Sequence, residues 1–173
     1  MAQSIDKLIL TISRASIQGG IPNDRYPISS LYDVRLTHHI TTDAVQQWKG
    51  YECAGIDSKF TDIRCRADPN LLAEGKTINA KRGVCLKPSV DTGGGRTFNP
   101  ENLKRCLDKN AYYYFYQTVS HTDTTLTFEI YWVPIQTVKA LYDAHGKNGL
   151  VPFKPFMKAL KSVPQVVTRE DRS

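Results

Sequence analysis

Asp62, Glu74 and Lys76 lie in the segment 60–78, whose pattern predicts two neighbouring strands. Asp62 falls in the first apolar run, and Glu74 and Lys76 fall in the second. Residues 68–70, with the sequence Asp-Pro-Asn, are typical of a turn, because proline fixes φ and Asp and Asn bond their own backbone. Glu74 and Lys76 are two positions apart, so in a strand both project from the same face. We therefore expect the three side chains to converge on one point.

Two carboxylates and an amine at one point suit the hydrolysis of a phosphodiester. Carboxylate oxygens hold Mg²⁺ at octahedral distances, and the ion keeps water positions open for substrate and nucleophile. An ammonium group beside them contacts the scissile phosphate and lowers the pKa of an attacking water, or acts as a base if its own pKa is depressed. The same spacing fits a surface hairpin in which Glu74 and Lys76 face water, and the residues alone leave this alternative open.

The residues resemble the motif of the PD-(D/E)XK nuclease superfamily. Asp62 matches the first acidic position, and Glu74-Gly75-Lys76 matches the (D/E)XK tripeptide, while Thr61 stands where the family name has proline. The resemblance implies that the two carboxylates bind Mg²⁺, which Mn²⁺ can replace, with help from the Gly75 carbonyl. It also implies that Lys76 orients or activates the attacking water and that cleavage leaves a 5′-phosphate.

The resemblance extends to fold and activity. It implies an α/β fold with a restriction-endonuclease-like central mixed β-sheet flanked by helices. We expect one nuclease-like domain, 1–173, with an N-terminal helical part (1–41), a catalytic core (42–145) and a C-terminal extension (146–173). The expected activity is that of an endodeoxyribonuclease, most like a type II restriction endonuclease, which cuts double-stranded DNA as a homodimer. Two alternatives stay open: a non-catalytic nucleic-acid-binding module, and a structural or partner-binding protein of phage type.

Positive charge is concentrated after the proposed site. The segment 76–109 contains eight Lys and Arg residues and three acidic ones, so it carries +5 of the chain's net charge of +6. Neutralised phosphates supply most of the non-specific affinity of proteins for nucleic acid, which makes this segment the candidate DNA contact, although a solvated basic face explains the charge equally well. The candidate DNA-binding residues are Lys81, Arg82, Lys87, Arg96, Lys104 and Arg105.

Helices are expected in the first part of the chain. Apolar residues at helical spacing over 5–12 predict a packing helix capped by Ser4. A second helix is expected over 28–40, where a strand pattern competes, and a third over 43–53. The resemblance implies a further carboxylate on the helix before the first strand, and Glu52 is the candidate for it; a solvated glutamate at a helix end is the alternative.

A helix followed by an aromatic strand pair is expected after the basic segment. Asn99 and Pro100 favour a helix start, with proline at the first helical position, and the helix is expected to end at Asn110. The aromatic runs 111–119 and 126–133 predict two paired strands that belong to the core. Gln117 shares a face with the inward side chains of its strand and is a candidate for a supporting role at the site. The remaining expected elements are helices over 135–145 and 153–160 and a frayed tail over 168–173.

Composition places the chain among ordinary globular proteins. A length of 173 residues suits one domain with a sizeable core. No apolar run is long enough to cross a bilayer, and no basic segment precedes the first apolar residues, so we expect a cytoplasmic protein without a membrane partner. The four cysteines are widely spaced without a CxxC pair, which argues against a zinc site and predicts free thiols.

Overall fold

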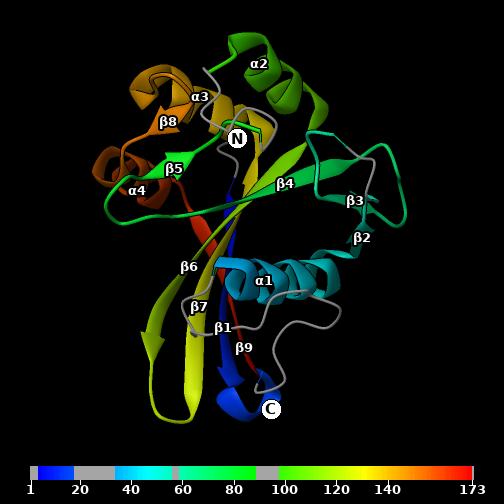
Figure 1. Cartoon of the computed structure of the whole chain (residues 1–173), viewed down its shortest axis with the longest axis vertical. Helices are drawn as coiled ribbons and strands as arrows, with labels where there is room; N and C mark the ends of the chain where they lie inside the picture. The colour runs from blue at the N-terminus through cyan, green and yellow to red at the C-terminus, as the bar shows by residue number, and fades with distance from the viewer. Residues whose placement is uncertain (1–3, 18–33, 56–58, 89–97, 173) are drawn as a thin grey trace.

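A computed structural model describes residues 4–17, 34–55, 59–88 and 98–172. In these residues the chain forms a mixed α/β fold, in which a curled seven-stranded sheet is flanked by four helices (Figure 1). In chain order the elements are β1 (Ile5–Ser13), a 3-10 helix (Arg14–Ile17), α1 (Val34–Lys49), β2 (Tyr51–Cys53), β3 (Ile63–Cys65), β4 (Leu72–Thr77), β5 (Val84–Cys85), α2 (Pro100–Lys109), β6 (Tyr112–His121), β7 (Thr125–Pro134), α3 (Ile135–His145), β8 (Leu150–Val151), α4 (Phe153–Ser162) and β9 (Gln165–Arg172).

The large sheet has the strand order β2-β3-β4-β6-β7-β1-β9. Strands β2, β3 and β4 form an antiparallel meander, and β4 then pairs with β6 in parallel. Strand β7 runs antiparallel to both β6 and β1, and β9 pairs with β1 in parallel. Strands β5 and β8 form a separate two-stranded sheet. The parallel step from β4 to β6 requires a crossover connection, and α2 lies within it.

Each face of the large sheet carries its own apolar core. Helices α2, α3 and α4 pack on one face, against Tyr113 and Phe115 of β6. Helix α1 packs on the other face, against Tyr114 and Tyr116 of the same strand. Successive side chains of a strand point to opposite faces, so one aromatic strand supplies both cores. Figure 1 shows α1 against the long strands, with α2 and α3 at one end of the molecule.

The prediction of an N-terminal helix is wrong, because residues 5–13 form strand β1 in the interior of the sheet. Leu8, Leu10 and Ile12 alternate toward the core on the α1 side, while Ile5 belongs to the core on the other side. The apolar spacing of this segment fits a period of 3.6 and a period of 2 alike. Pairing with β7 on one side and β9 on the other selects the strand.

One continuous helix replaces the two helices expected before the hairpin. Residues 28–33 lie outside the described part of the chain, and α1 runs unbroken from 34 to 49. Gly50 follows with φ of 72°, a left-handed conformation that favours glycine and stops a helix. Residues 51–53, expected to be helical, form β2 and pair with β3. The prediction missed this glycine as a stop signal.

The elements predicted between the hairpin at 60–78 and the helix at 153–160 are confirmed. Strands β3 and β4 pair around the predicted turn, where the Asn70 amide donates to Asp68 Oδ1 at 3.1 Å. Asn99 caps α2 by accepting from the amides of Glu101 and Asn102, and Pro100 occupies the first turn. The aromatic pair β6–β7 and helices α3 and α4 also lie where the sequence predicted them.

The C-terminal end is a strand of the sheet and not the frayed tail that was expected. Strand β9 pairs with β1 from Gln165 to Arg172 and forms one edge of the sheet. Within the basic segment, β5 pairs with β8. Residues 89–97, including Arg96, lie outside the described residues.

Gly75 is the strand position at which the packing of a neighbour requires a glycine. A Cβ atom at Gly75 would lie 2.4 Å from ring atoms of Tyr114. That ring is fully buried, and its hydroxyl bonds Thr42 Oγ1 at 3.0 Å. Gly75→Ala is therefore expected to lower the free energy of unfolding by about 1–3 kcal/mol.

Urea denaturation measures this loss, with Thr77→Ser on the same strand as a control expected to change stability by less than about 0.5 kcal/mol. Thr77 is exposed, so its substitution removes little packing. Equal stability of Gly75→Ala and the native chain would contradict the close packing of Tyr114 on β4.

Candidate functional site

The structure brings Asp62 and Glu74 together at the junction of β3 and β4. The Asp62 amide donates to the carbonyl of Ala73 at 3.0 Å, which continues the β3–β4 pairing by one residue. Glu74 and Lys76 project from the face of β4 that carries the α2–α4 core, opposite Tyr113 and Phe115 of β6. The expected convergence of the two acids is therefore present in the fold.

The Asp62 carboxyl group is fixed by the backbone of β4. Its Oδ2 atom accepts a hydrogen bond from the Gly75 amide at 2.8 Å. Gly75 directly follows Glu74, so the Asp62 carboxyl group lies beside the Glu74 side chain and raises its pKa.

Glu74 is the acid whose pKa the fold raises. Its side chain lies in the core, with 7% of the residue exposed. Burial, together with the neighbouring Asp62 carboxyl group, raises the pKa of Glu74 to about 8, and the Lys76 charge only partly offsets this. At neutral pH Glu74 is therefore largely uncharged in the metal-free protein.

Cys106 and Tyr113 complete the buried surroundings of Glu74. The Cys106 thiol lies 3.5 Å from Glu74 Oε2 and 3.0 Å from the Tyr113 hydroxyl. Burial, followed by the charge of Glu74, raises the pKa of Cys106 to about 12, so the thiol stays protonated and donates. From the sequence, Cys106 is expected only to be a free thiol, and its spacing along the chain does not indicate its contact with Glu74.

Asn110 ties α2 to the segment that precedes Asp62. Its Nδ2 atom donates to the Phe60 carbonyl at 2.6 Å and to the Cys106 carbonyl at 2.8 Å. Phe60 has φ of 69°, an uncommon left-handed conformation for a large side chain. The Cys106 thiol contacts the same Phe60 carbonyl at 3.4 Å. The end of α2 therefore holds a strained backbone two residues before the acid, a role that the sequence did not indicate.

Lys76 shares the site's strand face but bonds a neighbouring segment. Its Nζ atom donates to the carbonyl of Lys87 at 2.9 Å, which fixes the ammonium group over the basic segment. Its charge still lowers the pKa of Glu74 through space. The lysine thus contributes a positive potential to the acid pair from a fixed position.

Glu52 and Gln117 are bound elsewhere in the structure. Glu52 lies on β2, not on a helix as expected, and forms an ion pair with Arg64 at 3.2 Å in which both side chains are exposed. Gln117 is on the predicted face of β6, but its Nε2 atom donates to Glu129 at 3.3 Å. Neither side chain contacts Asp62 or Glu74 through a described hydrogen bond.

The described candidate DNA-binding residues lie in three places. Lys81 and Arg82 are exposed in a tight turn whose amides donate to Asn79 Oδ1 at 2.9 and 3.0 Å. Lys104 and Arg105 are exposed on α2, and Lys104 pairs with Asp108 at 2.5 Å. Lys87 is half-buried beside Lys76. Arg96 is outside the described residues.

Within the described part of the chain, no cluster of three or more His, Cys, Asp or Glu side chains is arranged to hold a metal ion. A metal site at the acid pair therefore depends on the carboxylates of Asp62 and Glu74 and on backbone oxygen atoms.

No described helix is long and apolar enough to cross a membrane. Comparisons of the chain with protein-family models, curated proteins and solved structures found no match.

The raised pKa of Glu74 predicts how the stability of the metal-free protein depends on pH. Between about 4.5, the ordinary pKa of glutamate, and about 8, the folded chain binds more protons than the unfolded chain. The free energy of unfolding is therefore expected to fall as pH rises through this window, by at most about 1.4 kcal/mol per pH unit. Glu74→Gln removes the titrating group, so its stability is expected to change less over the same window.

Chemical denaturation across this pH range, in the presence of a chelator, measures the difference. Glu101→Gln is the matched control, because Glu101 is exposed in the first turn of α2 and its loss leaves the buried pair intact. Identical pH profiles for Glu74→Gln and the native chain would show that Glu74 is not the buried acid that titrates.

Proposed function

We propose that this protein is a Mg²⁺-dependent endodeoxyribonuclease of the PD-(D/E)XK superfamily, most like a type II restriction endonuclease. One observation carries the proposal: Asp62, directly before β3, bonds the Gly75 amide beside the buried Glu74 of β4, and Lys76 lies on the same face of β4 as Glu74. A surface hairpin would leave these groups in water, whereas Glu74 is buried. A buried acid with a perturbed pKa beside a second acid is typical of functional sites.

The order of the surrounding elements supports the same superfamily. Helix α1 precedes the meander β2-β3-β4, and α2 then leads to β6, which pairs in parallel with β4. The resemblance drawn from the sequence calls for a helix before the hairpin and another between the (D/E)XK strand and the next strand. We therefore extend the proposal to a restriction-endonuclease-like core, with β7, β1 and β9 added beyond β6.

The chemistry of the donor set fits Mg²⁺. Asp62 and Glu74 supply carboxylate oxygens, which this ion prefers. The amide of Gly75 faces Asp62, and the N–H and C=O groups of one strand residue point to the same side, so the Gly75 carbonyl faces the same edge. Glu74 must lose its proton to serve as a ligand, which makes ion binding favoured by higher pH. Mn²⁺ has the same ligand preference and is expected to substitute.

Each site residue then has a role in the proposed hydrolysis. A bound divalent ion would polarise the phosphate and lower the pKa of a water molecule. Asp62 and Glu74 hold the negative charge that attracts the ion, and the Gly75 amide keeps Asp62 oriented toward Glu74. Lys76, fixed by the Lys87 carbonyl, orients or activates the attacking water and faces the anionic substrate.

The proposed substrate is double-stranded DNA, which the basic residues after β4 would attract. Lys81, Arg82 and Arg105 are exposed and therefore free to approach phosphates. Positive charge of this kind steers a polyanion toward the protein, and added salt weakens this attraction. The resemblance further implies a homodimer, in which each copy cuts one strand.

A non-catalytic nucleic-acid-binding module is the second candidate. It is favoured by the uncharged state of Glu74 at neutral pH and by the bond between Lys76 and the Lys87 carbonyl. In that case the acid pair would be a structural contact between β3, β4 and α2, and the exposed basic residues alone would carry the function.

Cleavage of plasmid DNA in Mg²⁺ tests the catalytic proposal. Glu74→Gln and Lys76→Met are expected to cut at least about 100-fold more slowly than the native chain, because a metal ligand or the activating amine is lost. Both variants are expected to bind DNA, and a chelator is expected to stop cleavage by the native chain.

Glu101→Gln and Lys158→Met are the matched controls, since both residues are exposed and distant in sequence from the acid pair. Normal cleavage by Glu74→Gln or Lys76→Met would show that the site is assigned wrongly. DNA binding at low salt without any effect of divalent ions would favour the binding module.

The salt dependence of DNA binding tests the basic turn. The double variant Lys81→Ala/Arg82→Ala is expected to bind more weakly at low salt and to reduce the slope of log affinity against log salt by up to about 2. Lys158→Ala/Lys161→Ala, which removes two exposed charges from α4, is the control. Fluorescence anisotropy of a labelled duplex gives both slopes, and equal slopes for the two double variants would exclude the turn as a specific contact.

A further inference from the structure

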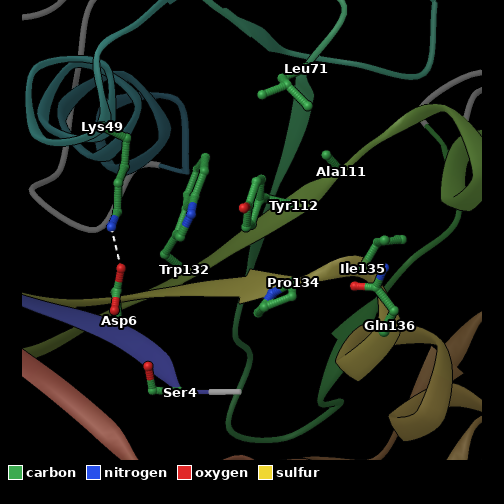
Figure 2. A pocket seen from close by; sticks show the side chains of 10 residues that line it. All are labelled: Ser4, Asp6, Lys49, Leu71, Ala111, Tyr112, Trp132, Pro134, Ile135 and Gln136. Atoms are coloured by element: carbon green, nitrogen blue, oxygen red, sulfur yellow. Dashed lines mark hydrogen bonds and ion pairs between the residues drawn. The ribbon is translucent and has the colours of Figure 1, made fainter. Parts of the chain in front are cut away.

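A cavity of about 770 Å³ lies on the α1 side of the sheet, across the strands from the acid pair (Figure 2). Its walls come from segments far apart in the chain: the end of α1, the starts of β1 and β6, and the end of β7. Lys49, Asp6, Tyr112 and Trp132 line it, with Leu71 and Ile135 on the apolar side. The proposed nuclease chemistry uses none of these side chains.

A ladder of aromatic rings ends at this cavity. Tyr116 stacks on Tyr114 with centroids 6.1 Å apart, and Tyr114 stacks on Trp132 at 6.5 Å. Trp132 in turn stacks on Tyr112 at 4.7 Å, with 20° between the ring planes. The first three rings are buried, whereas Tyr112 is half-buried. In Figure 2 the Tyr112 and Trp132 rings lie side by side. Among the described rings, Tyr112 is the last of this stack.

The charges of the cavity wall cancel. Lys49 Nζ forms a short ion pair with Asp6 Oδ2, and these are the two charged side chains among the described residues that line the cavity. The Lys49 ammonium also lies 4.3 Å from the centre of the Trp48 ring. A wall without net charge gives little advantage to a phosphate group, but it offers a carboxylate acceptor and an ammonium donor to a neutral ligand.

We propose that this cavity binds a nucleobase, which stacks on Tyr112 as the next ring of the ladder. Bases stack well on aromatic side chains because each base has an extended π-face. The edge of a base carries N–H donors and carbonyl or ring-nitrogen acceptors, which match Asp6 and Lys49, whereas a plain hydrocarbon ring has neither. The base is either that of a free nucleoside or an unpaired base on a strand, since the two share this chemistry.

Intrinsic fluorescence provides a direct readout. The chain has two tryptophans, and Trp132 lines the cavity while Trp48 packs against Lys49 at its wall. Titration of the full chain with adenosine is expected to quench this fluorescence saturably, and ribose is expected to have no effect. The titration is carried out with a chelator, so its outcome does not depend on the proposed nuclease activity.

Two variants at one position separate stacking from other effects. Tyr112→Leu removes the ring and is expected to weaken adenosine binding by about tenfold or more. Tyr112→Phe keeps the ring and is expected to bind as the native chain does. Unfolding curves for both variants establish that each is folded under the conditions of the titration.

A short single-stranded oligodeoxynucleotide, compared with the same strand of abasic sites, distinguishes the two sources of the base. Saturable binding that requires bases and depends on Tyr112 assigns the cavity to a base on a strand, and binding of adenosine alone assigns it to a free nucleoside. Absence of saturable quenching by either probe would overturn the proposal. Equal affinity of Tyr112→Leu and Tyr112→Phe would overturn it as well.

Discussion

The pairing of β6 with β7 is the constraint on which the rest of the fold depends. Residues 113–116 of β6 are nearly inaccessible, and their side chains alternate between the two cores. A strand buried on both faces must be covered by helices on both sides, and α1 on one side and α2, α3 and α4 on the other provide this cover. The parallel pairing of β4 with β6 then fixes Glu74 opposite Tyr113 and Lys76 opposite Phe115.

A carboxyl group in such a core opposes folding unless its polar atoms are bonded. The Cys106 thiol donates to Glu74, and burial together with Asp62 raises the pKa of Glu74 to about 8. Glu74 therefore keeps its proton near neutral pH, which spares the core a buried charge. An apolar residue of similar size would need none of these contacts. A fold that retains the acid, together with a strained Phe60 beside it, departs from the simplest solution, and such departures occur mainly at functional sites.

The acid pair and the aromatic cavity depend on consecutive positions of the same strands. Ala73 pairs with Tyr112, and Glu74 pairs with Tyr113. Since neighbouring residues of a strand face opposite sides, one step along β4 and β6 moves from the α1 side of the sheet to the α2 side. The two sites are therefore separated by the thickness of the sheet, and a change in the register of β6 would displace both.

The sequence by itself determined the elements whose signals are local: the turn at 68–70, the capped start of α2, the aromatic strands and the common face of Glu74 and Lys76. The tertiary structure decided the rest, because the deciding contacts join distant segments. Residues 5–13 fit a helix or a strand locally, and their pairing with β9 at the other end of the chain settles the choice. The contacts of Cys106 and Asn110 with Glu74 and Phe60 likewise arise only when α2 folds back over β4, and residue spacing along the chain carries no record of that approach.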